Sequence, residues 1–198
     1  AGLPGFAVLL SFFVLGSAAT LLGFRRKERA GIAQEKKGAR SARHALANCG
    51  VASYLALLMI GSGSPGLFAF AFVCAFATAA FDTVSSEIGQ AYGGRPVLIT
   101  TLRPVPAGTD GAVSWVGTLA GAVAALAVGG VATAGGLLPR GLLGLVAAAG
   151  LVGSTADSIL GATLERRGLL DNDAVNFSNT LIGALAGIGL AVLTATPL

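Results

Sequence analysis

Two acidic motifs in apolar surroundings are the parts of this sequence best suited to chemistry. Residues 82–89 read Asp-Thr-Val-Ser-Ser-Glu-Ile-Gly and follow the uncharged run 45–81, and residues 154–161 read Ser-Thr-Ala-Asp-Ser-Ile-Leu-Gly. An ionisable side chain at membrane depth raises the free energy of a protein, and its usual reason for being there is a functional site. The acids of these motifs indicate cation-assisted chemistry on an anion at the membrane edge.

The spacing of small polar residues predicts three helix faces that meet in one cavity. Positions i, i+3, i+4 and i+7 lie on one face of a helix. The residues at this spacing are Asp82, Ser85, Ser86 and Gly89; Ser154, Asp157, Ser158 and Gly161; and Asn176, Asn179, Thr180 and Gly183. Glu87 is five positions from Asp82, so it joins the first face only if the helix is broken or frayed there.

The composition indicates that a membrane surrounds these faces. Of the 198 residues, 54% are hydrophobic and 11% are charged, and the mean hydropathy is +0.80. A soluble domain carries about twice that charge. Stretches with almost no charge that are long enough to span a bilayer are 1–24, 45–81 (divided by a turn at 61–66), 111–139, 141–165 and 174–198. We therefore predict an all-α fold, a single integral membrane domain over 1–198 that forms a polytopic transmembrane bundle of about six helices.

The basic residues fall in alternate loops, and this pattern predicts an orientation. Lys and Arg in short loops stay on the cytoplasmic side of a membrane. They occupy loops at about 25–43, 90–110 and 166–173, and only Arg140 falls on the other side. We expect the site to face the cytoplasm of a prokaryotic plasma membrane. We also expect residues 1–24 to be a transmembrane helix rather than a cleaved signal peptide.

An internal repeat predicts how the helices are paired. Residues 112–122 align with 174–184, with Ala, Val, Thr, Leu, Gly and Ala recurring in register, and the region of Asp82 aligns in outline with that of Asp157. Both copies run in the same direction, so we expect two similar parallel helical hairpins, with residues 3–60 as a more diverged third. The small-residue faces would also permit a homodimer.

Several of these features also have a purely structural interpretation. Small and hydroxyl residues are ordinary packing positions in transmembrane helices, and Asp110 and the cluster 171–173 would serve as helix caps. Orientation alone explains the basic run 25–29. Cys49 and Cys74 lack metal-ligand spacing and fit buried small hydrophobes. Carboxylates at membrane depth fit a structural role less well.

Two loops carry groups that can hold an anion. Loop 96–111 is rich in proline and glycine and combines Arg103 and Thr109 with glycine amides next to the start of an apolar helix. The first basic loop adds cations of the kind that bind phosphate: Lys36, Lys37 and Arg40. The sequence contains no Walker loop and no kinase glycine-rich loop.

Five segments in this order resemble one family, the integral membrane family that includes plant phytyl phosphate kinase and many uncharacterised prokaryotic members. The segments are GIAQEKKGAR (31–40), DTVSSEIG (82–89), ITTLRPVPAGTDGAVS (99–114), DSILGATLE (157–165) and DNDAVN (171–176). Family members usually carry a further apolar segment before the position where this sequence starts, and Ala112 stands where a second glycine is common. The resemblance covers nearly the whole chain.

The resemblance implies a membrane-integral kinase. Its reaction would move a phosphoryl group from a nucleoside triphosphate, with CTP as the donor, to an isoprenyl monophosphate such as phytyl, farnesyl or geranylgeranyl phosphate. Phosphoryl transfer needs positioning and charge neutralisation, which Mg²⁺ held by carboxylates and basic side chains provide. We expect these small molecules and membrane lipid as partners, and no nucleic acid.

This interpretation assigns a role to each candidate residue. The predicted catalytic residues and metal ligands are Asp82, Glu87 and Asp157, with Asp173 as a further metal ligand. The predicted phosphate contacts are Lys36, Lys37, Arg40 and Arg103. Their predicted polar partners are Asn48, Ser86, Thr109, Asn172 and Asn176.

Three other functions stay open at this point. A polyprenol kinase would differ only in its acceptor. Another CTP-linked lipid transferase is a rival, although the Asp-Gly-x-x-Ala-Arg pattern of CDP-alcohol phosphotransferases is absent. A transporter of anionic or isoprenoid substrates would need polar groups that continue to the opposite side of the membrane, where this sequence offers few.

Overall fold

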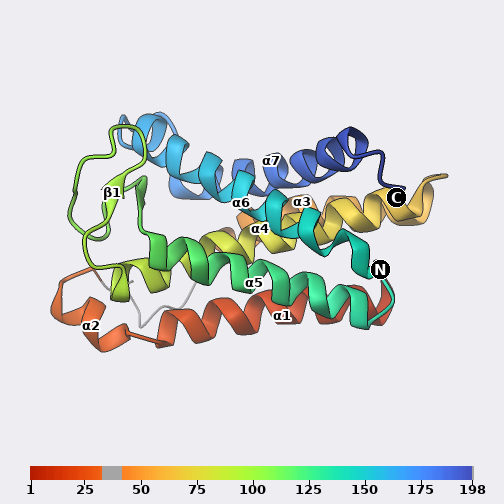
Figure 1. The fold of residues 1–198 in the computed structure, drawn as a ribbon, viewed down its shortest axis with the longest axis horizontal. Coiled ribbons are helices and arrows are strands. Elements are labelled where there is room, and N and C mark those ends of the chain that lie inside the picture. The colour runs from red at the N-terminus through yellow and green to blue at the C-terminus, as the bar shows by residue number, and fades with distance from the viewer. Residues whose placement is uncertain (33–41, 198) are drawn as a thin grey trace.

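Six long apolar helices run side by side in the computed structural model, which describes residues 1–32 and 42–197 (Figure 1). The helices are α1 (Gly2–Leu21), α2 (Phe24–Arg29), α3 (Ala42–Gly61), α4 (Pro65–Tyr92), α5 (Trp115–Ala134), α6 (Leu143–Leu160) and α7 (Asn172–Leu193). All but α2 are long and apolar enough to cross a bilayer. The predicted all-α polytopic bundle is confirmed.

Short elements occupy the connections between these helices. The strands β1 (Val97–Leu98) and β2 (Ala112–Val113) pair antiparallel within the loop that follows α4. A 3₁₀ turn, η2 (Arg140–Leu142), precedes α6, and a π-helical turn, η3 (Gly161–Glu165), extends it. The sequence predicted loops at these positions, because two-residue strands and the six-residue helix α2 are too short to show a periodic pattern.

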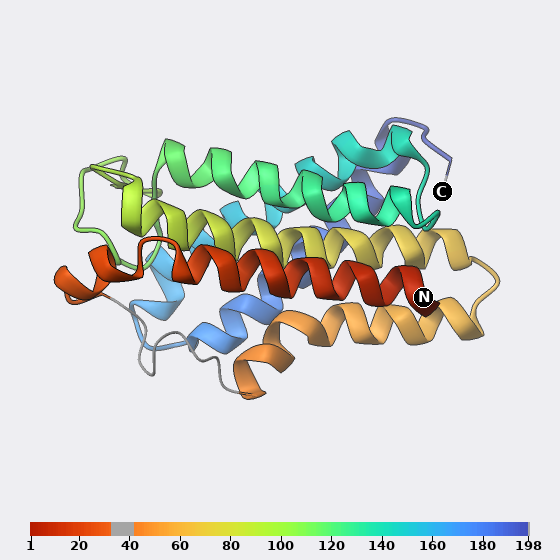
Figure 2. The same cartoon turned by 90° about the horizontal axis from the view of Figure 1, so that it is seen from below.

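Helix α4 forms the centre of the bundle and packs against five of its neighbours, α1, α3, α5, α6 and α7 (Figure 2). Every residue from Ala69 to Val84 is buried. The first part of this stretch, 69–77, is rich in alanine and phenylalanine and apolar on all sides, which is typical of a helix enclosed by others. Phe76 packs on both Phe12 of α1 and Phe72, with ring centroids 5.8 and 5.0 Å apart.

Glycines of the outer helices let them approach α4 closely at Thr78. A Cβ atom added to Gly183 of α7 would lie 1.9 Å from the Thr78 Oγ1 atom, and one added to Gly153 of α6 would lie 2.3 Å from the Thr78 Cγ2 atom. Small residues at such crossings are the usual means of tight helix packing in membranes.

This crossing gives a stability prediction. Gly183→Ala is expected to lower the free energy of unfolding by about 1–3 kcal/mol, because the added methyl group overpacks the α4–α7 contact. Gly189→Ala on the same helix is the matched control, since no heavy atom lies within 4 Å of its added Cβ. Thermal unfolding in detergent measures both, and equal midpoints for the two variants would contradict the packing.

The two predicted hairpins differ at their second helices. Consecutive helices α4 and α5 pack together, as do α6 and α7. However, α5 begins at Trp115, whereas α7 begins at Asn172, upstream of Phe177, which aligns with Trp115. The prolines and the β1–β2 pair delay the start of α5, while Asp171 caps α7 by accepting a hydrogen bond from the Ala174 amide at 2.9 Å.

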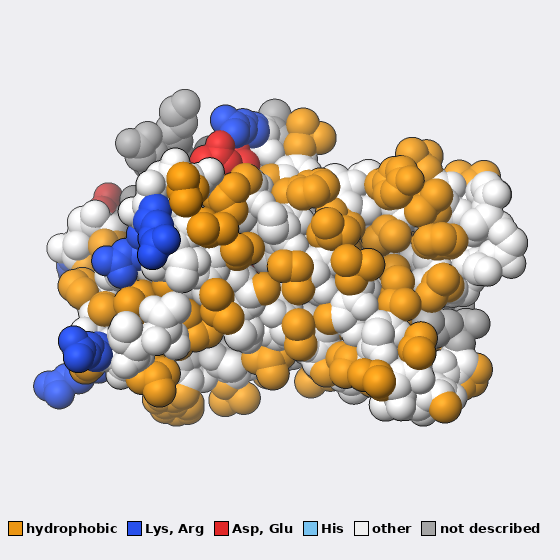
Figure 3. Space-filling model, turned by 90° about the horizontal axis from the view of Figure 1, so that it is seen from above, with side chains coloured by type: hydrophobic (Ala, Val, Ile, Leu, Met, Phe, Trp, Pro, Cys, Tyr) orange, Lys and Arg blue, Asp and Glu red, His pale blue; other side chains and the backbone are white. Residues whose placement is uncertain are grey.

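Charged side chains gather at one end of the bundle. Figure 3 shows Lys, Arg, Asp and Glu at the end that carries α2 and the β1–β2 loop, while the rest of that face is largely apolar. Both chain termini lie at the other end (Figure 1). Among the charged residues that the structure describes, only Arg140, between α5 and α6, belongs to the terminal end. The charged end is therefore where polar chemistry can take place.

Candidate functional site

A polar cavity of about 370 Å³ opens at the charged end of the bundle. Its walls come from α4, the loop 96–114, the start of α5, the end of α6 with η3, the start of α7, and His44 of α3. Five helices and one loop thus contribute side chains to a single space, which includes the three predicted polar faces.

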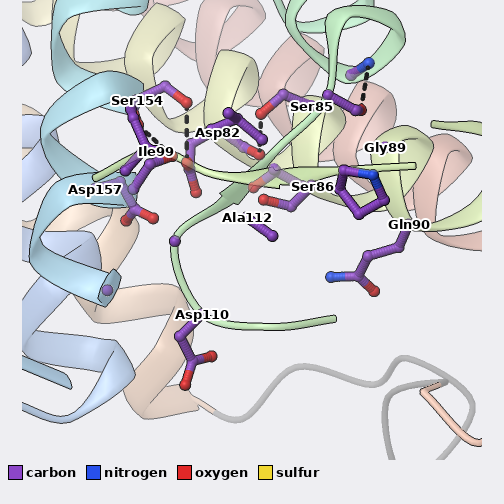
Figure 4. Close-up of a pocket in the computed structure, with 18 of the residues that line it drawn as sticks. Asp82, Ser85, Ser86, Gly89, Gln90, Ile99, Asp110, Ala112, Ser154 and Asp157 are labelled. Carbon is purple, nitrogen blue, oxygen red and sulfur yellow. Dashed lines mark hydrogen bonds between the residues drawn. The ribbon is translucent and has the colours of Figure 1, made fainter. Parts of the chain in front are cut away.

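Asp82 of α4 and Asp157 of α6 lie together in this cavity (Figure 4). The Ser154 hydroxyl donates to Asp82 Oδ1 at 3.1 Å, and the Asn179 amide of α7 donates to Asp157 Oδ1 at 2.7 Å. The Asp157 carboxyl group also lies within hydrogen-bonding reach of Asp82. Two adjacent carboxylates repel each other unless a proton or a cation is held between them.

The cavity lining is rich in carboxylate oxygens, which are the ligands that a divalent cation such as Mg²⁺ takes in proteins. Asp110 and Glu165 line the same cavity as the aspartate pair. No group of three or more His, Cys, Asp or Glu side chains that could hold a metal occurs in the part of the chain that the structure describes. Mg²⁺ is commonly bound by one or two carboxylates together with substrate phosphates. The Asp82–Asp157 pair suits that arrangement better than a metal cage made of protein alone.

Glu87 borders the same cavity, but its carboxylate does not join the aspartate pair. Helix α4 continues unbroken to Tyr92, so the Glu87 side chain points toward α1 and α2 and is 3% exposed. It forms a buried ion pair with Lys27 of α2 and accepts a hydrogen bond from the Thr20 hydroxyl at 3.0 Å. The frayed helix end that would have brought Glu87 to Asp82 is absent from α4, and its carboxylate is occupied by Lys27.

The Lys27 contact belongs to a small interface between α2 and the end of α4. Gly23 adopts a φ of +79° at the turn into α2, and an added Cβ there would lie 2.5 Å from the Ala91 Cβ atom. The Arg26 guanidinium lies over the Tyr92 ring at 4.9 Å. The basic run, which orientation alone seemed to explain, therefore also packs α2 against α4.

Asp173, the other predicted metal ligand, lies outside the cavity lining. Its Oδ2 atom contacts Arg43 Nε at 2.9 Å, and its Oδ1 atom lies 3.3 Å from His44 Nδ1. Arg43 also pairs with Asp171. The Ala174 amide, and after it Arg43, holds the pKa of Asp171 below its usual range. These contacts tie the start of α7 to α3.

The predicted phosphate-binding residues divide into three groups. Those that line the cavity are Ser86, Thr109, Asn172 and Asn176. Arg103 and Asn48 are not part of the lining: Arg103 is exposed on the loop, and Asn48 is buried in α3 and donates to the His44 carbonyl at 3.1 Å. Lys36, Lys37 and Arg40 lie outside the described residues.

Sequence reasoning missed part of the lining. Asp110 was interpreted as a helix cap, but Ser114 caps α5 by accepting from the Gly117 amide at 3.1 Å, and Asp110 borders the cavity. Gln90, one turn beyond Ser86, was not considered. The signal for Gln90 was its spacing on the same helix face. Among the described lining residues there is no Lys or Arg.

The loop that covers the cavity is packed against η3 through Gly111. This glycine has a φ of +76°, and an added Cβ would lie 2.5 Å from both the Ser158 carbonyl oxygen and the Ala162 Cβ atom. The loop therefore sits directly on the end of α6, near Asp157.

This contact predicts how the loop responds to substitution. Gly111→Ala combines an unfavourable φ, which costs about 1–2 kcal/mol, with a clash against α6, so the loop should detach. Hydrogen exchange of the amides in 97–112 should then become faster than in the unchanged protein. Gly94→Ala is the control, because Gly94 has a similar φ of +70° with no atom within 4 Å of the added Cβ. Equal exchange in both variants would show that this contact does not hold the loop.

Comparison with known proteins places the chain in a family. The family model described as integral membrane protein DUF92 matches residues 1–184. The chain is 39% identical over 192 residues to the uncharacterized membrane protein sll0875 of Synechocystis, covering 96% of this chain and 74% of that protein. It is 36% identical over 184 residues to the uncharacterized membrane protein MJ0933 of Methanocaldococcus jannaschii, covering 91% and 74% respectively.

A plant relative is also similar. The chain is 36% identical over 195 residues to the chloroplastic protein VTE6 of Arabidopsis thaliana, covering 94% of this chain but only 58% of that protein's length. No solved structure matches the chain. The chain belongs to the integral membrane protein family DUF92, and the resemblance noted from its motifs is thereby confirmed.

Proposed function

We propose that this membrane protein transfers a phosphoryl group from a nucleoside triphosphate, with CTP as donor, to an isoprenyl monophosphate. The observation that carries the proposal is the meeting of Asp82 and Asp157, from two different helices, in a polar cavity at the charged end of an apolar bundle. Membership of the family that includes plant phytyl phosphate kinase supports the same reaction class.

The reaction would proceed by direct displacement. An oxygen of the acceptor monophosphate attacks the terminal phosphorus of the nucleotide, a new P–O bond forms, and the bond to the bridging oxygen breaks to release the nucleoside diphosphate. The acceptor is already an anionic nucleophile, so no general base is required. Such a reaction depends mainly on positioning and on neutralising charge.

The chain's own residues would supply positioning in the cavity. Asp82 and Asp157 would hold Mg²⁺, which when bound would supply positive charge to offset that of the phosphates. Ser154 and Asn179 fix the two carboxylates through the hydrogen bonds given above. The start of the 20-residue helix α5 borders the cavity at Ser114 and Gly117, and helix N-termini favour phosphate groups.

The half of the bundle nearest the chain termini is apolar, and this favours an enzyme with an amphiphilic acceptor over a transporter. Helix α4, which the structure describes throughout, has no polar side chain from Pro65 to Ala77. Its polar residues begin at Thr78 and continue toward the charged end. A transport pathway would need such groups on both sides of the membrane, whereas an enzyme needs them only where head groups meet the nucleotide.

The test is transfer of labelled terminal phosphate from CTP or ATP by the purified protein with magnesium, using a panel of isoprenyl alcohols and monophosphates. Labelled diphosphate from the monophosphates alone is the expected result. Label on the alcohols would reassign the protein as a polyprenol kinase. Transfer to neither acceptor class would overturn the proposal.

A further inference from the structure

An apolar groove between α5 and α6 adjoins the polar cavity. Its walls are α5 and α6, and its base is the Phe81 ring of α4. Three residues line both spaces: Phe81, Thr118 and Leu151. The groove and the cavity are therefore neighbouring compartments with a shared wall, one apolar and the other polar.

The base of the groove is held in place by two glycines. A Cβ atom added to Gly121 of α5 would lie 2.6 Å from Phe81 Cδ1, and one added to Gly150 of α6 would lie 3.4 Å from Phe81 Cδ2. The ring is thus clamped between α5 and α6 and is only 2% exposed. Phe81 directly precedes Asp82 in α4, so one turn of helix fixes both the base of the groove and the Asp82 carboxylate of the cavity.

Small side chains on α5 and α6 leave the groove open above the Phe81 ring. Ala122 of α5 and Ala147 and Ala148 of α6 line it, and Thr118, at the border with the cavity, is its one polar lining residue among those described. Trp115, 76% exposed at the polar end of α5, lies where tryptophan side chains favour the membrane interface. From Trp115 to Ala122 the groove runs on the order of 10 Å, at 1.5 Å per residue.

We propose that this groove binds the part of the isoprenyl monophosphate's hydrocarbon chain nearest the phosphate, and that it favours acceptors long enough to fill it over short prenyl monophosphates. The inference rests on the proposed function, because it requires the phosphate of the acceptor to lie in the Asp82–Asp157 cavity. In an amphiphile of this kind, the anionic head matches the polar cavity and the methyl-branched apolar chain matches the groove. Chain atoms beyond the groove continue into the surrounding lipid.

Filling the groove tests the proposal. Ala147→Phe and the milder Ala122→Leu should lower kcat/KM for geranylgeranyl monophosphate by about tenfold or more relative to a five-carbon prenyl monophosphate. Val123→Phe is the matched control, since Val123 neighbours Ala122, is 60% exposed and does not line the groove. An unchanged ratio in both groove variants would overturn the proposal.

Photo-cross-linking separates this inference from the proposed reaction. A diazirine-tagged geranylgeranyl monophosphate, mapped by mass spectrometry, should label residues of the groove on α5 and α6, and the untagged compound should compete. Labelling there without any phosphoryl transfer would support the groove and reject the kinase. Transfer with labelling confined to other helices would support the kinase and reject the groove.

Discussion

Asp82→Asn or Asp157→Asn is expected to lower phosphoryl transfer about 10²- to 10³-fold while the protein stays folded in detergent. The amide keeps the shape of the side chain but removes the charge that neutralises the metal–phosphate complex. In Asp82→Asn the amide oxygen can still accept from Ser154, and in Asp157→Asn it can still accept from Asn179. The loss should therefore appear in turnover and not in the thermal unfolding midpoint.

Asp173→Asn is the matched control for these variants. It is the same chemical change at the same end of the molecule, but the Asp173 carboxylate contacts Arg43 and His44 and lies outside the cavity lining. We expect its turnover to stay close to that of the unchanged protein. Full activity of the double variant D82N/D157N, or a loss in D173N as large as in D82N, would be incompatible with the assigned site.

Lys27→Met is expected to destabilise the protein by about 3–5 kcal/mol, because it leaves the Glu87 carboxylate buried without its cation. Lys27 and Glu87 are 2% and 3% exposed, so water cannot replace the lost partner. Chemical or thermal unfolding in detergent measures the effect. We attribute this destabilisation to the Glu87 charge that is left buried and unpaired, and not to the attraction lost between Glu87 and Lys27.

A second substitution checks that cause. In the double variant Lys27→Met/Glu87→Gln, the charge is gone and the glutamine still accepts from Thr20, so most of the lost stability should return. If Glu87 acted on substrate instead, Glu87→Gln would stop turnover without a matching loss of stability. If the double variant is no more stable than Lys27→Met, the ion-pair explanation is wrong.

The helices and the aspartate pair were predictable from the sequence because each depends on local spacing. Uncharged runs give the spans, and the i, i+3, i+4 pattern of polar residues predicted three helix faces that meet in one cavity, although not which side chains pair across it. The structure brings these residues together. The central burial of α4 was not predicted, although its alanine- and phenylalanine-rich first half is apolar on all sides.

The partner of Glu87 was not predictable from local pattern. Lys27 lies in a basic run that positive-inside orientation already explains, so nothing in the sequence marks it as buried. Its burial depends on a left-handed turn at Gly23 that lays α2 back against the end of α4. The partner of Lys27, Glu87, is 60 residues away in the chain. Only the tertiary arrangement shows that these two charges meet.

The cavity-covering loop shows a second limit of the same kind. The prolines and glycines of 96–111 predicted an irregular anion-binding loop but not which side chains face inward. In the structure Thr109 and Asp110 line the cavity, whereas Arg103 does not. The fit of Gly111 against Ser158 and Ala162 decides this orientation, and a contact between distant segments leaves no trace in the local sequence.

The central claim is that Asp82 and Asp157 together hold the divalent metal of a nucleotide complex. Mn²⁺ in place of Mg²⁺ makes this directly measurable by electron paramagnetic resonance of the protein with a non-hydrolysable CTP analogue. We predict a bound Mn²⁺ signal in the unchanged protein and in Asp173→Asn, and its loss in Asp82→Asn and in Asp157→Asn. The same bound signal in all four proteins would contradict the account.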